Sequence, residues 1–235
     1  MKYYFHLVII LMTLTSCSVI DFKNFEFPFD LKPIKNRLTP ELKNSDVYIG
    51  DPVYIRIFKE EHILELWMKS ENSGRYKLVK AYSICKWSGR LGPKFVEGDH
   101  QAPEGFYATD LFSLNPQSRY HLSFNVNYPN AFDQIYGRTG SFIMVHGDCV
   151  SEGCYAMTDR SVEEIYLLVE RALGAGQRSV PIHIFPFRMT QERLQAEWQS
   201  PHYTFWKNLK EGHDFFDRYG RPPEWTVKYG MYDFY

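Results

Sequence analysis

The sequence of 235 residues lacks an excess of either charge. It has 27 lysine and arginine residues against 28 aspartate and glutamate residues, which leaves a formal net charge of −1. Nucleic-acid-binding proteins need clustered positive charge to displace counterions from the phosphate backbone. The balance therefore argues against nucleic acid as a partner. The chain also lacks an internal repeat and a second clear domain boundary, so we expect one sizeable domain with appendages.

Cysteine is scarce as well, with four residues, at positions 17, 85, 149 and 154. Their spacing lacks the paired Cys-x-x-Cys pattern of zinc sites, so the sequence predicts no metal and no cofactor. If Cys17 carries a lipid, three cysteines remain, which is an odd number for a compartment that oxidises thiols. At most one disulfide can then form within the chain. The count leaves open which thiol stays free.

Long hydrophobic runs are also missing, apart from residues 5–12 near the N-terminus. That run follows Lys2, is too short to span a bilayer, and fits the apolar part of a secretory signal. It ends in Leu-Thr-Ser-Cys at residues 14–17, which resembles the bacterial lipobox. The resemblance implies a lipoprotein signal peptide over residues 1–16 and a lipidated Cys17; the alternative is an ordinary signal peptide. With Ser18 next, it implies an exported, periplasmic protein anchored in the outer membrane.

What the sequence does have, from residue 47 onwards, is strand-like alternation. Residues 53–57 and 64–68 alternate around a polar turn at 59–62, which predicts a β-hairpin. Further strands are predicted at 76–85, from 105, at 120–126 and at 141–145. Such runs, separated by turn signals, favour an antiparallel sandwich or barrel. Residues 17–46 show no clear period and are interpreted as a lipid anchor and tether.

Helical spacing dominates the last third of the chain. Residues 161–173 form an apolar face, and Ser161 with Glu164 fits a capping box. Residues 180–187 return to a strand pattern, in which Pro181 indicates an edge position or a strand start. Residues 190–199 and 203–219 are interpreted as amphipathic helices. We therefore predict a mainly β fold with added helices (α+β), with a domain over 47–187 and a helical extension over 188–235 packed on it.

The residue types that carry chemistry gather between positions 142 and 159. His146 ends a predicted strand, and Cys154 follows eight residues later, after Ser151 and Gly153. A nucleophilic thiol needs a base within hydrogen-bond reach and donors for the developing oxyanion. A neighbouring imidazolium or the positive end of a helix lowers a thiol pKa. On spacing alone, a disulfide between Cys149 and Cys154 or a buried structural histidine explains the pattern equally well.

This segment resembles the signature of the L,D-transpeptidase catalytic domain (YkuD) family, and is closest to its YafK-like branch. The matching positions are His146, Gly147, Ser151, Gly153 and Cys154. Residues 103–107, Pro-Glu-Gly-Phe-Tyr, are similar to the family's Thr-Pro-x-Gly-x-Tyr/Phe strand start. Two positions depart from the pattern. Glu152 stands where most members have a second histidine, and Ala156 where many have arginine.

The resemblance implies an L,D-transpeptidase-like β-sandwich with a helix after the catalytic cysteine and helices at the C-terminus. It makes Cys154 the nucleophile and His146 the general base, oriented by a backbone carbonyl rather than a carboxylate. The oxyanion and site backbone would come from Gly153, Ser151 and Gly147. Arg138 and Tyr155 are candidate substrate-binding residues, and the cations Lys94 and Arg90 also lie in loops near the motif.

The reaction implied is attack of the thiolate on an amide carbonyl of a peptidoglycan stem peptide. An amine acceptor then gives a cross-link or attaches a protein to the wall. Water gives cleavage, which in the YafK-like branch includes release of a lipoprotein from peptidoglycan. A lipid-anchored wall-binding module without catalysis is the alternative from another class. An activated Cys154 is expected to react with iodoacetamide well below pH 8, whereas a disulfide-bonded one reacts only after reduction.

Overall fold

The computed structural model describes residues 30–235. The predicted signal peptide and the predicted lipidation site, Cys17, lie outside the described residues, so both stay predictions. No helix within residues 30–235 is both long and apolar enough to cross a membrane.

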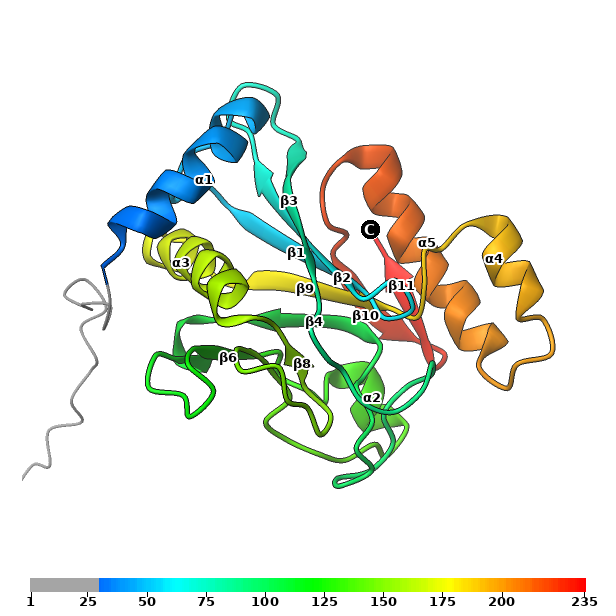
Figure 1. Cartoon of the computed structure of the whole chain (residues 1–235). Helices are drawn as coiled ribbons and strands as arrows, with labels where there is room; N and C mark the ends of the chain where they lie inside the picture. Colours follow the sequence, from blue (N-terminus) through cyan, green and yellow to red (C-terminus); the bar gives the residue numbers. More distant parts are fainter. Residues whose placement is uncertain (1–29) are drawn as a thin grey trace, which may run out of the picture.

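Two β-sheets form the centre of the molecule (Figure 1). The first has the order β3-β2-β1-β9-β4, and the second has the order β5-β6-β7-β8. The strands of the first are β1 (Val53–Phe58), β2 (Ile63–Lys69), β3 (Tyr76–Ser83), β4 (Gly105–Thr109) and β9 (Val180–Phe185). Those of the second are β5 (Leu114–Asn115), β6 (Ser123–Asn125), β7 (Met144–His146) and β8 (Tyr155–Ala156).

Helices surround the sheets, and a short hairpin ends the chain. They are α1 (Lys32–Ser45), α2 (Ala131–Ile135), α3 (Asp159–Gly174), α4 (Gln191–Ala196) and α5 (Tyr203–Tyr219), with a 3₁₀ turn at Leu111–Ser113. The hairpin consists of β10 (Trp225–Lys228) and β11 (Met231–Phe234). This arrangement confirms the predicted α+β class. The hairpin itself was not predicted.

The predicted pairing is confirmed for the first hairpin, since β1 pairs antiparallel with β2 from Val53 opposite Met68 to Phe58 opposite Ile63. The prediction of a purely antiparallel arrangement is wrong, however. Strand β1 runs parallel to β9, and β7 runs parallel to β8. Parallel neighbours cannot be joined by a tight turn, so each pair needs a longer connection. The connection from β7 to β8 is the loop that carries the motif.

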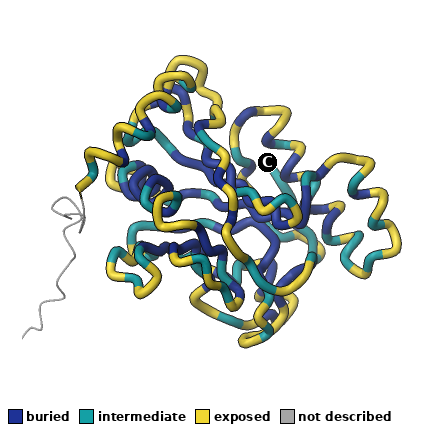
Figure 2. Tube along the Cα trace, in the orientation of Figure 1, coloured by how far each residue is buried: buried dark blue, intermediate teal, exposed yellow. Residues whose placement is uncertain are grey.

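Strand β1 is buried at all six positions because both faces of its sheet are covered. Val53, Ile55 and Ile57 face a core shared with α1, α3 and the second sheet. The alternate residue Phe58 faces a second cluster built with α5 and the C-terminal hairpin. Figure 2 shows the buried stretches, in dark blue, gathered toward the centre and the exposed ones mostly on the outer turns. A strand covered on both sides cannot show simple apolar–polar alternation.

Residues 32–45 correct the predicted tether, because they form α1 and pack onto the core. Three apolar residues spaced four apart are buried there: Ile34, Leu38 and Leu42. Their burial stabilises the docked helix by about 2 kcal/mol each. Arg37 adds contacts to α3, through Glu163 at 3.1 Å and Glu164 at 2.7 Å. Pro40 inside the helix and only three buried positions made this pattern hard to read from the sequence.

Two smaller expectations are also corrected. Helix α3 begins after Thr158, whose side chain accepts a hydrogen bond from the Ser161 amide, so the cap lies three residues earlier than Ser161. Pro181 is the second residue of β9, and β9 lies inside the sheet between β1 and β4. Of the two interpretations of Pro181, the strand start is therefore right and the edge position is wrong.

Candidate active site

The pairing of β7 with β8 brings the two motif residues together. The register sets Val145 level with Tyr155 and His146 level with Ala156, and therefore Met144 level with Cys154. Side chains alternate between the faces of a strand, and level residues on neighbouring strands share a face. Val145 and Tyr155 point into the core. His146 and Cys154 consequently project from the opposite face, on strands about 5 Å apart.

His146 is held by its own backbone neighbour. Its Nδ1 lies 2.6 Å from the carbonyl oxygen of Gly147. A carbonyl can only accept, so Nδ1 carries the proton and Nε2 remains the basic nitrogen. Burial lowers the pKa of His146, and the Gly147 hydrogen bond and the charge of Asp148 oppose this. The ring also lies against Tyr120, with centroids 4.9 Å apart.

The Cys154 thiol faces backbone groups in the resting structure. It accepts a hydrogen bond from the Met144 amide at 3.3 Å and donates to the Phe142 carbonyl at 3.7 Å. Within the described part of the chain, no hydrogen bond joins it to His146. Burial raises the pKa of the thiol, while the Met144 amide and the charge of Lys94 act to lower it.

The direction of this pKa corrects the expectation of a resting thiolate. Strand β8 and residues 157–158 separate Cys154 from α3, and the field of a helix end falls off within about one turn. The imidazole is neutral rather than cationic because burial lowers its pKa. The two pKa shifts therefore both favour the uncharged forms, a thiol and a neutral imidazole.

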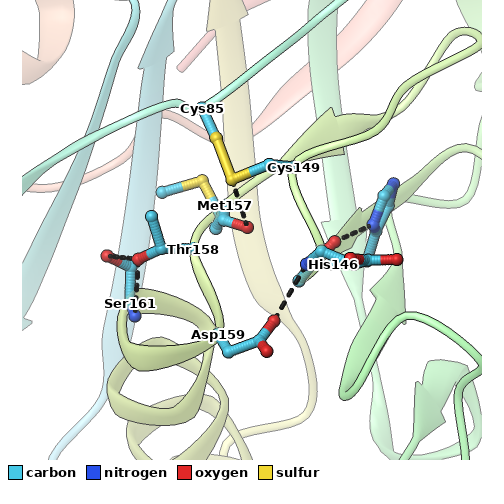
Figure 3. Close-up of a disulfide and its surroundings, with 9 residues drawn as sticks. Cys85, His146, Cys149, Met157, Thr158, Asp159 and Ser161 are labelled. Carbon is cyan, nitrogen blue, oxygen red and sulfur yellow. Dashed lines mark hydrogen bonds between the residues drawn. A yellow bond between two sulfur atoms is a disulfide. The ribbon is translucent and has the colours of Figure 1, made fainter.

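A disulfide between Cys85 and Cys149 fixes the loop that joins β7 and β8 (Figure 3). Cys154 is the free cysteine among residues 30–235. This pairing removes the alternative of a Cys149–Cys154 bond. Asp159, at the start of α3, also holds the loop by accepting a hydrogen bond from the Asp148 amide at 2.9 Å.

The loop between β7 and β8 contains unusual backbone conformations. Asp148 and Cys149 have φ values of 68° and 48°, in the left-handed region that most residues avoid. Gly153 has a φ of 121°, which favours glycine immediately before the nucleophile. Ser151 closes the turn by donating its hydroxyl to the Cys154 carbonyl at 2.7 Å.

Gly147 contributes its carbonyl to the site, by holding His146, but not its amide. A Cβ there would lie 2.5 Å from Asp159 Oδ1 and 2.9 Å from the Tyr120 carbonyl. Its amide donates to the carbonyls of Tyr120 and Leu122. The Gly147 amide is thus already occupied and does not serve as an oxyanion donor. Close packing of the loop against residues 120–122 explains the glycine.

Two pockets open on either side of Cys154 and His146, and both residues line both pockets. One, of about 430 Å³, includes Lys86 and Glu152. The other, of about 460 Å³, includes Arg119 and Phe142. Tyr120 lines both and marks the boundary between them. The thiol therefore lies where a ligand on each side can reach it.

The two candidate substrate-binding residues, Arg138 and Tyr155, do not line the Cys154 pockets. The Tyr155 side chain is fully buried, and its hydroxyl donates to the Pro103 carbonyl at 2.6 Å. Arg138 is buried and pairs with Asp133 at 2.7 Å, in a pocket that does not contain Cys154. Odd and even positions on a strand face opposite ways, so the neighbour of an outward-facing nucleophile points into the core.

The other two cations near the motif are not in the Cys154 pockets either. Lys94 is buried and bonded to Asp99, and the Arg90 carbonyl accepts a hydrogen bond from Lys59. The cations that do line the pockets, Lys86 and Arg119, were missed. Lys86 follows Cys85 and pairs with Ala156 beside the nucleophile, so knowledge of the disulfide would have located it. No sequence signal identified Arg119.

The described residues contain no group of three histidine, cysteine or acidic side chains that could hold a metal ion. The site therefore offers a thiol, an imidazole and two flanking pockets. Those groups suit nucleophilic attack on a carbonyl with proton transfer through the imidazole.

The chain is similar in sequence to a known protein and, more weakly, in fold to two solved structures. The chain is 46% identical over 184 residues to "Putative L,D-transpeptidase YafK" of Escherichia coli (strain K12), covering 78% of this chain and 74% of that protein. The helical cell shape determining protein Pgp2 of Campylobacter jejuni is 17% identical, with 80% of each chain covered and a TM-score of 0.46. Bdellovibrio bacteriovorus Bd1075 is 20% identical, with 78% of this chain and 79% of that chain covered and a TM-score of 0.41. No protein-family model matches. On the identity to YafK across most of both sequences, the chain belongs to the L,D-transpeptidase family, in its YafK-like branch.

Proposed function

We propose that this protein is a cysteine-dependent acyl-transfer enzyme that acts on peptidoglycan stem peptides. The observation that carries the proposal is the free thiol of Cys154 beside His146 in two shared pockets. The nearby Cys85–Cys149 disulfide keeps the other two cysteines of the described chain unreactive. The relative's description as an L,D-transpeptidase supports the choice of substrate.

The first half-reaction follows from the two protonation states. The Cys154 thiol turns away from the Phe142 carbonyl, and its proton passes to His146 Nε2 as the sulfur attacks the substrate carbonyl carbon. The imidazolium then gives that proton to the nitrogen of the leaving amine, and the carbon–nitrogen bond breaks. The product is a thioester on Cys154 and a free amine. The Gly147 carbonyl favours the imidazolium while it exists.

The second half-reaction reverses these steps with a new acceptor. An amine or a water molecule loses a proton to His146 and attacks the thioester carbonyl, and the sulfur leaves. An amine produces a cross-link or attaches a protein to the wall, and water produces cleavage. Two pockets around one thiol provide separate space for the acyl group and for the leaving or entering group.

The direct test replaces the nucleophile. Cys154→Ala should lower turnover of purified sacculi by about 10⁴-fold or more, because no other group can form the thioester. The matched control is the double variant Cys85→Ser/Cys149→Ser, which removes sulfur from the same loop and should retain measurable turnover. Full activity in Cys154→Ala would show that the thiol is not the nucleophile.

Product analysis separates the possible outcomes. New cross-links identified by mass spectrometry indicate transpeptidation, and shortened stems or released lipoprotein indicate hydrolysis. Sacculi that are bound but unchanged would indicate a binding module and would contradict the proposal.

Thiol alkylation gives a second measurement on the free enzyme. Burial raises the pKa of Cys154 above its ordinary value of 9.0. The rate of iodoacetamide labelling should therefore keep rising beyond pH 9 instead of levelling below pH 8. A plateau below pH 8 would indicate a stabilised resting thiolate, as the sequence alone suggested.

The same proposal includes export to the periplasm and a lipid anchor on Cys17, supported by the lipobox-like residues 14–17. The partners would then be the stem peptides, a wall-linked lipoprotein and the outer membrane. Fractionation tests the anchor. The wild-type protein should sediment with outer membranes, and Cys17→Ala should not.

A further inference from the structure

A third pocket, of about 410 Å³, lies between the catalytic domain and the C-terminal extension. It shares no lining residue with the two pockets at Cys154. One side comes from Phe95, Tyr136 and Arg138, and the other from α5 and the β10–β11 turn, including Phe205 and Gly230. The Tyr136 hydroxyl donates to the Gly230 carbonyl at 2.8 Å and joins the two sides. The C-terminal extension therefore forms one wall of this pocket.

The rim of this pocket is aromatic and open. The exposed fractions of Phe95 and Tyr136 are 49% and 55%. Large aromatic side chains are usually more buried, and ligand sites combine such rings with a few polar groups. The flat face of a ring suits a ligand with an apolar face and polar edges. A pyranose sugar has this shape, with C–H groups on its faces and hydroxyl groups at its edge.

Arg138 supplies the polar group of the pocket. It is only 8% exposed, and its guanidinium lies 5.4 Å from the ring centres of both Phe95 and Tyr136. Its Nη1 is bonded to Asp133, but its Nε is buried without a hydrogen-bond partner among the described residues. This Nε is fully covered, so a ligand oxygen reaches it only when a neighbouring ring moves, and pairing a costly unpaired donor favours that change.

The charge of the ligand follows from Asp133. This carboxylate is fully buried and already compensates the charge of Arg138 at 2.7 Å. A second anion would leave excess negative charge in a poorly solvated place, which is costly. A neutral oxygen, such as an acetamido carbonyl or a hydroxyl, adds a hydrogen bond without that cost. The pocket therefore favours a neutral polar ligand over a carboxylate or a phosphate.

We propose that this pocket binds an acetamido sugar of a glycan strand while the stem peptide occupies the site at Cys154. The choice of glycan rests on the proposed function. Arg138 and Phe142 are four residues apart, so their Cα atoms are separated by at most about 15 Å. Phe142 lines a Cys154 pocket, and an extended peptide of five residues spans about 17 Å. One glycopeptide is long enough to contact both places.

The test uses chitotetraose, a soluble β-1,4 tetramer of N-acetylglucosamine, titrated calorimetrically into the protein. Tyr136→Ala and Phe95→Ala should each weaken binding about fivefold, as expected for loss of one aromatic contact. Tyr136→Phe keeps the ring and should bind as the wild type does, which separates stacking from the Gly230 hydrogen bond. Phe112→Ala removes an exposed ring outside the pocket and serves as the matched control.

Thermal unfolding of each variant confirms that it is folded. No binding by the wild type at millimolar chitotetraose, or equal binding by folded Tyr136→Ala and wild type, would overturn the glycan site. Displacement of chitotetraose by acetate or phosphate would overturn the preference for a neutral ligand.

A second readout keeps this inference separate from the catalytic proposal. The ratio of turnover on sacculi to turnover on a sugar-free stem peptide should fall in Tyr136→Ala and stay unchanged in Phe112→Ala. An equal ratio in all variants would contradict a glycan role. Binding of chitotetraose that depends on Tyr136 in a protein without any turnover would support the glycan site and defeat the proposed enzyme activity.

Discussion

His146 and His183 lie on strands of the two different sheets, and burial lowers the pKa of both rings. Their surroundings differ. His146 lines two pockets, and only its Nδ1 is bonded, to a backbone carbonyl. His183 lies beneath α5, 2.9 Å from the Tyr54 hydroxyl, with its ring edge-on to Phe106 at 4.6 Å. A shifted pKa alone therefore does not mark the active site, whereas access to a pocket does.

Charged side chains also differ between the region beneath α5 and the Cys154 pockets. Beneath α5, Arg56 is buried and paired with Glu65 and with Asp217. Lys59 and Glu104 form an ion pair in which both side chains are fully buried. In the Cys154 pockets, the cation Lys86 and the anion Glu152 are exposed. Paired and buried charges fix the domain and the extension together, and exposed charges remain available to a ligand.

The largest expected effect tests the two histidines against each other. His146→Gln should lower kcat on sacculi by about 10²- to 10⁴-fold, because a general base is lost. His183→Gln keeps a hydrogen-bonding group beside Tyr54 and should change kcat by less than about twofold. Both variants are compared in one steady-state assay. Equal losses of kcat in the two variants would contradict different roles for His146 and His183.

The next effect concerns the buried ion pair. Lys59→Met leaves the Glu104 carboxylate buried without its cation and should lower the free energy of unfolding by about 3–5 kcal/mol. Urea unfolding measures this change. The control is Lys59→Met/Glu104→Gln, which removes both charges and should recover part of the loss, since the single amide oxygen can still accept from either Gly92 or Trp206, which bond different oxygens of Glu104. No recovery would mean that the loss comes from packing.

The disulfide is expected to contribute somewhat less. Cys85 and Cys149 are separated by 64 residues, and closing such a loop restricts the unfolded chain. Cys85→Ser/Cys149→Ser should lower the free energy of unfolding by about 2–4 kcal/mol. It should also reduce turnover, because the loop between His146 and Cys154 loses its attachment. By contrast, Lys59→Met should lower the free energy of unfolding with little loss of turnover.

The smallest effect is a dependence of stability on pH. In the folded protein, burial and the charge of Arg56 depress the pKa of His183 well below 6.5. The unfolded chain therefore binds a proton below pH 6.5 that the folded chain does not. Neutral His183 therefore costs no stability above pH 6.5. Below it, the free energy of unfolding falls as pH decreases, by up to about 1.4 kcal/mol per pH unit for this group. His183→Gln should flatten the slope between pH 6.5 and 5 in urea unfolding.

Local sequence determined the candidate site because its parts are close in the chain. His146, Cys154 and the turn between them belong to one strand–loop–strand unit of nine residues, so one short segment carried the family resemblance that selected them, whereas spacing alone left a disulfide or a buried histidine open. The β1–β2 hairpin and α5 were predicted for the same reason, since period and turn residues are local signals.

Contacts between distant segments were decided only by the tertiary structure. The disulfide partner of Cys149 lies 64 residues away, and α1 belongs to the core through only three buried residues, spaced four apart. Arg138 and Tyr155 are buried away from the Cys154 pockets, and burial raises the pKa of the Cys154 thiol. Desolvation depends on which segments cover a group, and the order of residues along a chain does not contain that information directly.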